Sequence, residues 1–121
     1  MRQILPFVLL ATVPSIAFAA PAAQTCGPPA AGWKQARGDR VSPVNTVVLY
    51  DHGDHAPTWN GSVVSTDNIR EYLGVTAQMS PQPIFVLIVS PNADCREVDA
   101  LRRMASEVLK CGSHQCVEVS P

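Results

Sequence analysis

The chain has 121 residues and a formal net charge of −1, with 46% hydrophobic but only 6% aromatic residues. A chain of this length suits one small domain, and its near-neutral charge argues against a nucleic-acid-binding surface. Because aromatic residues are few, the core must consist mainly of aliphatic side chains.

Residues 1–19 have the pattern of a secretory signal peptide. A basic residue precedes an apolar run, and the run ends in small residues that place cleavage after Ala19. A retained membrane anchor is the alternative, but the run is short for a span of about 20 residues and contains Pro6 and Pro14. We therefore expect a periplasmic or secreted protein with no stable membrane span after cleavage.

Residues 20–43 are rich in Ala, Pro and Gly and lack apolar periodicity, which predicts an extended arm. Trp33 is interpreted as a partly covered tryptophan of this arm. Beyond it, residues 44–50 are β-branched and apolar and predict a strand. Residues 51–57 predict a turn, and residues 58–64 predict a second strand that completes a β-hairpin.

The segment from Trp59 onward predicts a tight turn followed by a capped helix. Asn60-Gly61 supplies the positive φ angles of a hairpin-type turn. The hydroxyl of Ser65 or Thr66 is expected to cap the helix by accepting from its first amides. Apolar positions then follow helical spacing up to Pro81 and Pro83, which end the helix: Ile69, Tyr72, Leu73, Thr76 and Met79.

Residues 84–89 form a continuous apolar run of strand length, which is typical of a central strand. A second helix is predicted over 95–110, where Asp94 and Glu97 resemble a capping box and Gly112 follows the end. Its expected apolar stripe is Val98, Leu101, Met104, Ala105, Val108 and Leu109, with Arg96, Arg102 and Arg103 facing solvent.

Residues 116–119 predict a short last strand, so the element order is β-β-α-β-α-β. This order predicts an α+β fold with the helices packed on one small mixed sheet over residues 44–121. The hairpin over 50–64 and the last strand over 115–119 are the expected sheet edges.

Four cysteines in a small exported protein favour two disulfides. Cys95 and Cys111 bracket the predicted helix of about 16 residues, which separates them by roughly 20 Å or more at 1.5 Å per residue. A disulfide needs Cα atoms within about 7 Å of each other. Cys111–Cys116 closes a short loop, and Cys26–Cys95 then joins the arm to the start of the helix.

The cluster of Asp51, His52, Asp54 and His55 is the one that suggests a metal or catalytic site, with His114 as a further ligand. Asp and Gly are also expected in a tight turn for backbone reasons, and we favour the turn. The loop between Cys111 and Cys116 lacks the two-residue spacing of redox motifs, and no hydrolase, metalloprotease or phosphate-binding motif appears. We predict no catalytic, cofactor-binding or metal-binding residues and no enzymatic activity.

The run from 44 to 119 resembles the periplasmic domain of the ExbD/TolR family. The resemblance is carried by strand 44–50, the Asp51-His52-Gly53 turn, Trp59 to Val64, strand 83–89 and helix 95–110 with the Gly112 turn. It implies the α+β fold, dimers and contacts with periplasmic partners. The family has an essential aspartate in an N-terminal membrane helix, whereas residues 3–20 contain no acidic residue here.

The leading hypothesis is therefore a non-catalytic periplasmic interaction module, accessory to TonB/Tol-type biopolymer transport or envelope energisation. Its expected partner is an envelope protein, either a TonB/Tol-type component or a second copy of the chain as a homodimer. The alternative is a small secreted metal-binding protein or enzyme that uses His52, His55 and His114.

Overall fold

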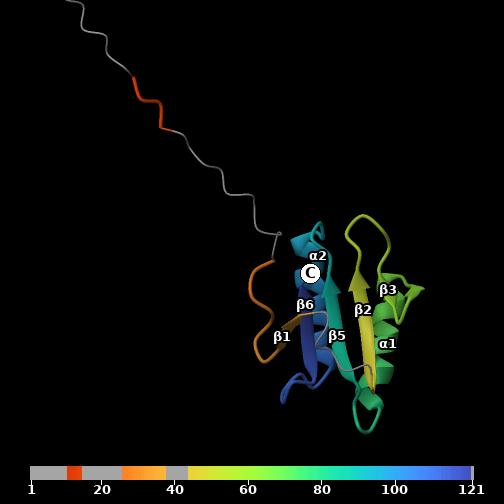
Figure 1. The fold of residues 1–121 in the computed structure, drawn as a ribbon. Coiled ribbons are helices and arrows are strands. Elements are labelled where there is room, and N and C mark those ends of the chain that lie inside the picture. The colour runs from red at the N-terminus through yellow and green to blue at the C-terminus, as the bar shows by residue number, and fades with distance from the viewer. Residues whose placement is uncertain (1–10, 15–25, 38–43, 121) are drawn as a thin grey trace, which may run out of the picture.

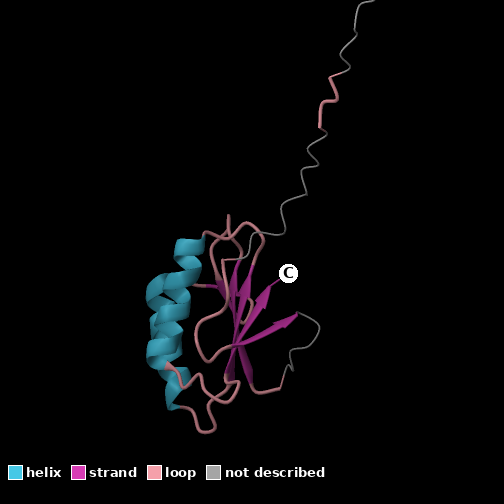
Figure 2. Cartoon of the chain, turned by 90° about the vertical axis from the view of Figure 1, so that its left-hand side faces the viewer, coloured by secondary structure: helices cyan, strands magenta, loops and turns pink. Residues whose placement is uncertain are grey.

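The computed structural model describes residues 11–14, 26–37 and 44–120, so the predicted signal peptide lies almost entirely outside the described residues. The elements are β1 (Lys34–Arg37), β2 (Thr46–Asp51), β3 (Thr58–Trp59), β4 (Ser62–Val63), α1 (Thr66–Gln78), β5 (Ile84–Val89), α2 (Cys95–Val108) and β6 (Cys116–Ser120). They form a mixed sheet in the order β1-β6-β5-β2-β3-β4 (Figure 1). Both helices cover the same face of the sheet (Figure 2). The predicted α+β fold is confirmed.

The centre of the sheet is parallel, with β5 between β2 and β6. Alternate residues of β5 point to opposite faces, because side chains along a strand alternate. Phe85, Leu87 and Val89 join the core beneath the helices, whereas Val86 packs with Val117 and Val119 on the other face. The apolar run of β5 therefore marks a central strand, as predicted.

Helix α1 begins at the cap that the sequence predicts. The Ser65 hydroxyl accepts from the Asn68 backbone N–H at 3.1 Å, and the Asn68 side-chain oxygen accepts from the Ser65 N–H at 3.1 Å. Ile69, Leu73 and Thr76 form the buried stripe. Met79 was expected on that stripe but is the C-cap residue and is 49% exposed, because the buried stripe ends one turn earlier.

Helix α2 is shorter than predicted, since it ends at Val108 with Leu109 as C-cap. Asp94 is the N-cap, and its side chain accepts from the Arg96 N–H at 2.9 Å. A capping box was expected at this helix, but the reciprocal pair of hydrogen bonds is found at the start of α1 instead. Gly112 does not end the helix as expected. It lies in the following turn, where its carbonyl accepts from the Gln115 N–H at 3.2 Å.

The predicted second strand over 58–64 is in fact a tight hairpin of β3 and β4. Asn60 and Gly61 have φ angles of 47° and 89°, which reverse the chain between the two short strands. Asn60 also fixes this hairpin to β2, because its N–H donates to the Val48 carbonyl and its side-chain oxygen accepts from the Val48 N–H, both at 2.8 Å.

The arm contains a strand that the sequence did not predict. β1 pairs in parallel with β6 in a register that joins Lys34 to Val117 and Arg37 to Ser120. The expectation that the last strand forms a sheet edge is therefore wrong, because β6 lies between β1 and β5. Among the described residues, the edges of the sheet are β1 and β4.

Candidate functional site

The four cysteines form two disulfides. Cys26 pairs with Cys95 at a Cα–Cα distance of 5.1 Å, and Cys111 pairs with Cys116 at 4.7 Å. These are the pairs expected from the predicted position of the second helix. Two disulfides in a small domain indicate an oxidising compartment.

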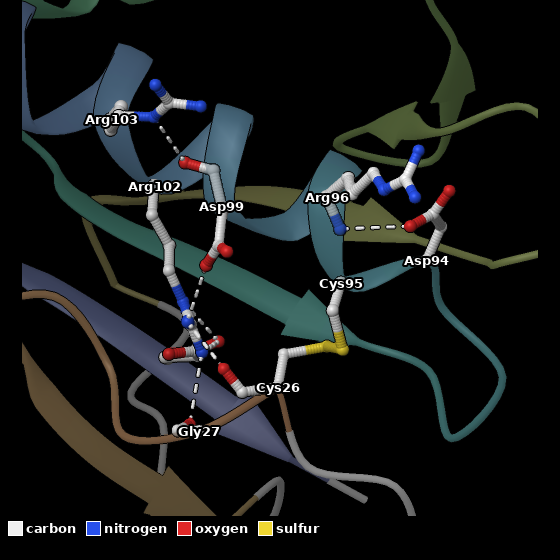
Figure 3. A network of polar contacts seen from close by, with 9 residues as sticks. Cys26, Gly27, Asp94, Cys95, Arg96, Asp99, Arg102 and Arg103 are labelled. Atoms are coloured by element: carbon white, nitrogen blue, oxygen red, sulfur yellow. Dashed lines mark hydrogen bonds and ion pairs between the residues drawn. A yellow bond between two sulfur atoms is a disulfide. The ribbon is translucent and has the colours of Figure 1, made fainter.

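A buried arginine connects the arm to the rest of the domain. Arg102 donates to Oε1 of Glu118 on β6 from Nη2 at 2.7 Å and from Nε at 3.1 Å. It also donates to the Cys26 carbonyl at 2.9 Å and the Gly27 carbonyl at 3.3 Å. Figure 3 shows Arg102 reaching from α2 to these two residues, next to the disulfide. The prediction that Arg102 faces solvent is wrong.

The position of Arg102 in the sequence contains the signal that was missed. It lies four residues after Val98 and three before Ala105, and both of these residues are buried on α2. Residues at these spacings share one face of a helix. Glu118 likewise alternates with Val117 and Val119, so it points to the helix-covered face of β6.

Trp33 is a second anchor of the arm rather than a partly covered linker residue. It is 8% exposed, and its ring contacts the Phe85 ring edge-on at a centroid distance of 5.7 Å. Its indole N–H donates to the Ser106 hydroxyl on α2 at 2.9 Å. An aromatic ring buried in this way with its polar group paired contributes strongly to packing.

A groove of about 670 Å³ lies between the arm and α2. Pro28, Ala30 and Ala31 line its arm side, and Asp99, Arg102, Arg103, Ser106 and Glu107 line its helix side. The guanidinium of Arg102 already donates to four partners, and the Ser106 hydroxyl accepts from Trp33. These polar groups of the lining are therefore engaged within the fold.

The opposite edge of the sheet carries exposed apolar side chains. Val63 on β4 is 72% exposed, and Val75 on α1 is 57% exposed. Tyr72 and Met79 lie at helical spacing from Val75 and are also exposed. The Tyr72 ring contacts the Trp59 ring of β3 at 5.6 Å, which places this stripe of α1 beside the hairpin. We call Val63, Tyr72, Val75 and Met79 the hairpin-edge surface.

The structure separates the residues of the predicted alternative metal site. Asp51 ends β2 and residues 52–55 follow it, whereas His114 precedes β6, and the two strands run parallel with β5 between them. His114 therefore lies at the opposite end of the sheet. No group of three or more His, Cys, Asp or Glu residues among the described residues is placed to hold a metal ion.

The side chains of this turn have structural partners. His52 stacks on Tyr50 with ring centroids 3.9 Å apart, and its Nε2 lies 2.9 Å from the Thr58 hydroxyl. Gly53 has a φ of 81°, and a Cβ atom there would lie 2.9 Å from the Asn92 carbonyl oxygen. The turn therefore packs closely against the loop that leads to α2, which requires glycine.

Three carboxylates gather where this turn meets the start of α2. Asp51 is 1% exposed, and its Oδ1 accepts from the Gly53 N–H at 3.0 Å while its buried Oδ2 has no hydrogen-bond partner among the described residues. Partial burial of Glu97, together with the charges of Asp51 and Asp94, raises the pKa of the Glu97 carboxyl.

In comparisons with known proteins, no family model, curated protein or solved structure matches the chain. No helix within the described ranges is long and apolar enough to cross a membrane.

Proposed function

We propose that this chain is a non-catalytic protein-interaction domain of the cell envelope, of the ExbD/TolR periplasmic kind. In this proposal the segment 1–19 directs export, and the folded domain binds an envelope protein of a TonB-type or Tol-type system or a second copy of itself. The element order of strand, hairpin, helix, strand, helix and strand from β2 to β6 supports the resemblance.

The single observation that carries the proposal is the hairpin-edge surface. It combines a short edge strand, β4, with exposed apolar side chains at 72% for Val63 and 57% for Val75. Tyr72, Val75 and Met79 form an exposed stripe on α1, whereas Val63 pairs with Thr58 and therefore faces away from the side on which Trp59 contacts Tyr72. An exposed apolar stripe beside a sheet edge is typical of protein interaction sites, and the strand edge adds main-chain donors and acceptors. Near the turn at 51–55, Oδ1 of Asp51, the His52 ring and the Asp54 carboxylate each have a hydrogen-bond partner within the fold, which favours binding over chemistry.

The test is cross-linking in living cells, followed by purification of a tagged full-length chain from the envelope. We compare the unaltered chain with Val75→Asp and with the matched control Ala100→Asp, which lies on the exposed side of α2. We expect one defined envelope protein or a dimer with the unaltered chain and with Ala100→Asp. We expect its loss with Val75→Asp, because a charge opposes burial of this surface.

The proposal fails if Val75→Asp and Ala100→Asp give the same cross-linked species. Circular dichroism of both variants establishes that each remains folded.

A further inference from the structure

Two separate attachments meet at Cys26, the first residue of the arm that the structure describes. The side chain of Cys26 is covalently bound to Cys95 at the start of α2. The carbonyl of the same residue accepts from Nη1 of Arg102, which lies seven residues further along α2 and thus about 10 Å away along the helix axis. The disulfide and the guanidinium therefore hold the arm at two different turns of the helix.

The guanidinium is held in place by contacts that do not involve the disulfide. The side chains of Arg102 and Glu118 are only 8% and 6% exposed, and their charged groups lie 2.7 Å apart. Asp99 accepts a further bond from Nη1 at 3.1 Å. Separating a buried ion pair leaves an uncompensated charge, which is strongly unfavourable. Arg102 is thus expected to keep its position whether or not the disulfide is present.

Further along the arm, the chain is fastened again before it leaves the sheet. Trp33 packs against Phe85 and donates to Ser106, and β1 then pairs with β6 along its whole length. With the arm in place, the outer edge of β6 is closed. Without it, the edge would present unpaired N–H and C=O groups that an extended segment could join.

We propose that the hydrogen bonds of Arg102 are a second attachment of the arm beside the Cys26–Cys95 disulfide. Because of this attachment, β1 stays paired with the outer edge of β6 when the disulfide is reduced. When both are released, Trp33 and the pairing of β1 with β6 are the remaining attachments of the arm described here, and β1 then opens locally more often. In the reduction, a dithiol passes two electrons and two protons to the two sulfur atoms. Cys26 and Cys95 become thiols, and the reducing dithiol is oxidised to a disulfide. This inference stands independently of the proposed function.

The test uses hydrogen exchange of the full chain, read separately for the amides of β1 and β5. Cys26→Ala with Cys95→Ala removes this disulfide and leaves Cys111–Cys116 intact. Arg102→Lys is then added, because lysine keeps the charge opposite Glu118 but lacks the planar fork that reaches both carbonyls. Arg103→Lys is the matched control, since Arg103 is exposed and, within the described part of the chain, its side chain donates to the Asp99 carbonyl of its own helix alone.

We expect β1 amides to stay protected in the chain without the disulfide and in that chain with Arg103→Lys. Adding Arg102→Lys instead should speed exchange of β1 at least about tenfold while β5 is unchanged. The proposal is overturned if removal of the disulfide alone releases β1, or if Arg102→Lys protects β1 as well as Arg103→Lys does. It is also overturned if Arg102→Lys without the disulfide makes β1 and β5 exchange together, because the arm is then no separate unit.

Discussion

The two edges of the sheet differ in how they are attached to the rest of the domain. At the arm edge, the segment before β1 is held by the Cys26–Cys95 disulfide, by the buried Arg102 of α2 and by the buried ring of Trp33. At the hairpin edge, β4 has two residues, and the surface beside it exposes Val63 and Val75. Chain segments at the arm edge are bound internally, so the hairpin edge is the better candidate for binding another protein.

The largest expected effect comes from proline in the strand next to the arm edge. Val117→Pro removes a backbone donor from β6, which pairs on both sides with Lys34 and Val86. Because proline is not accommodated in an interior strand, we expect loss of cooperative thermal unfolding. Val63→Pro on the outermost strand should keep a cooperative transition. Equal losses in the two variants would show that the edges are equally integral to the fold.

The next effect is expected at the buried ion pair. Arg102→Met leaves the carboxylate of Glu118 buried without its partner and should lower the free energy of unfolding by about 3–5 kcal/mol. Arg103→Met on the exposed side should change it by no more than about 0.5 kcal/mol. Urea unfolding measures both, and similar midpoints for the two variants would contradict the role given to Arg102.

The two disulfides should contribute unequally to stability. Their sequence separations are 69 and 5 residues. In the chain-entropy model these loops correspond to about 4 kcal/mol for Cys26–Cys95 and about 2 kcal/mol for Cys111–Cys116. Paired Cys→Ala variants, compared by urea unfolding, should keep this order. The reverse order would mean that the short loop before β6 matters more than the attachment of the arm.

The smallest effect is expected at Glu97. A raised pKa in the folded state means that the folded chain holds this proton more tightly than the unfolded chain does. Stability contributed by this group is therefore present below its ordinary pKa of 4.5 and is lost as pH rises through the raised value. Glu97→Gln should flatten the acidic part of the stability–pH curve, whereas Glu107→Gln, on the last turn of α2, should retain it. Curves of identical shape for the two variants would contradict a raised pKa of Glu97, which arises first from its partial burial and then from the charges of Asp51 and Asp94.

Local patterns were sufficient to predict most of the fold. The Ser65 cap, the apolar run of β5 and the spacing of Val98, Leu101 and Ala105 are signals within single elements. Each element begins where expected, although α2 ends two residues early. The second predicted strand failed because Asn60-Gly61 forms a turn inside it. The Asn60-Gly61 turn itself was predicted and is confirmed, but it lies inside the predicted strand and divides it into β3 and β4.

The arm could not be predicted in the same way, because its structure depends on distant residues. Lys34–Arg37 has no strand-like alternation, and β1 forms by pairing with β6 more than 80 residues away. Arg102 also has a charged side chain, which on average favours solvent. Its burial depends on Glu118 and on two carbonyls of the arm, none of which is near it in sequence.

A photo-reactive residue placed in turn at Val63 and at Gln35 tests the difference between the edges most directly. Both positions are exposed, the first on β4 and the second on β1. After irradiation of living cells, we predict a defined cross-linked product from position 63 and none from position 35. A product from position 35 with none from position 63 would contradict the account, because the internally fastened edge would then be the one that binds.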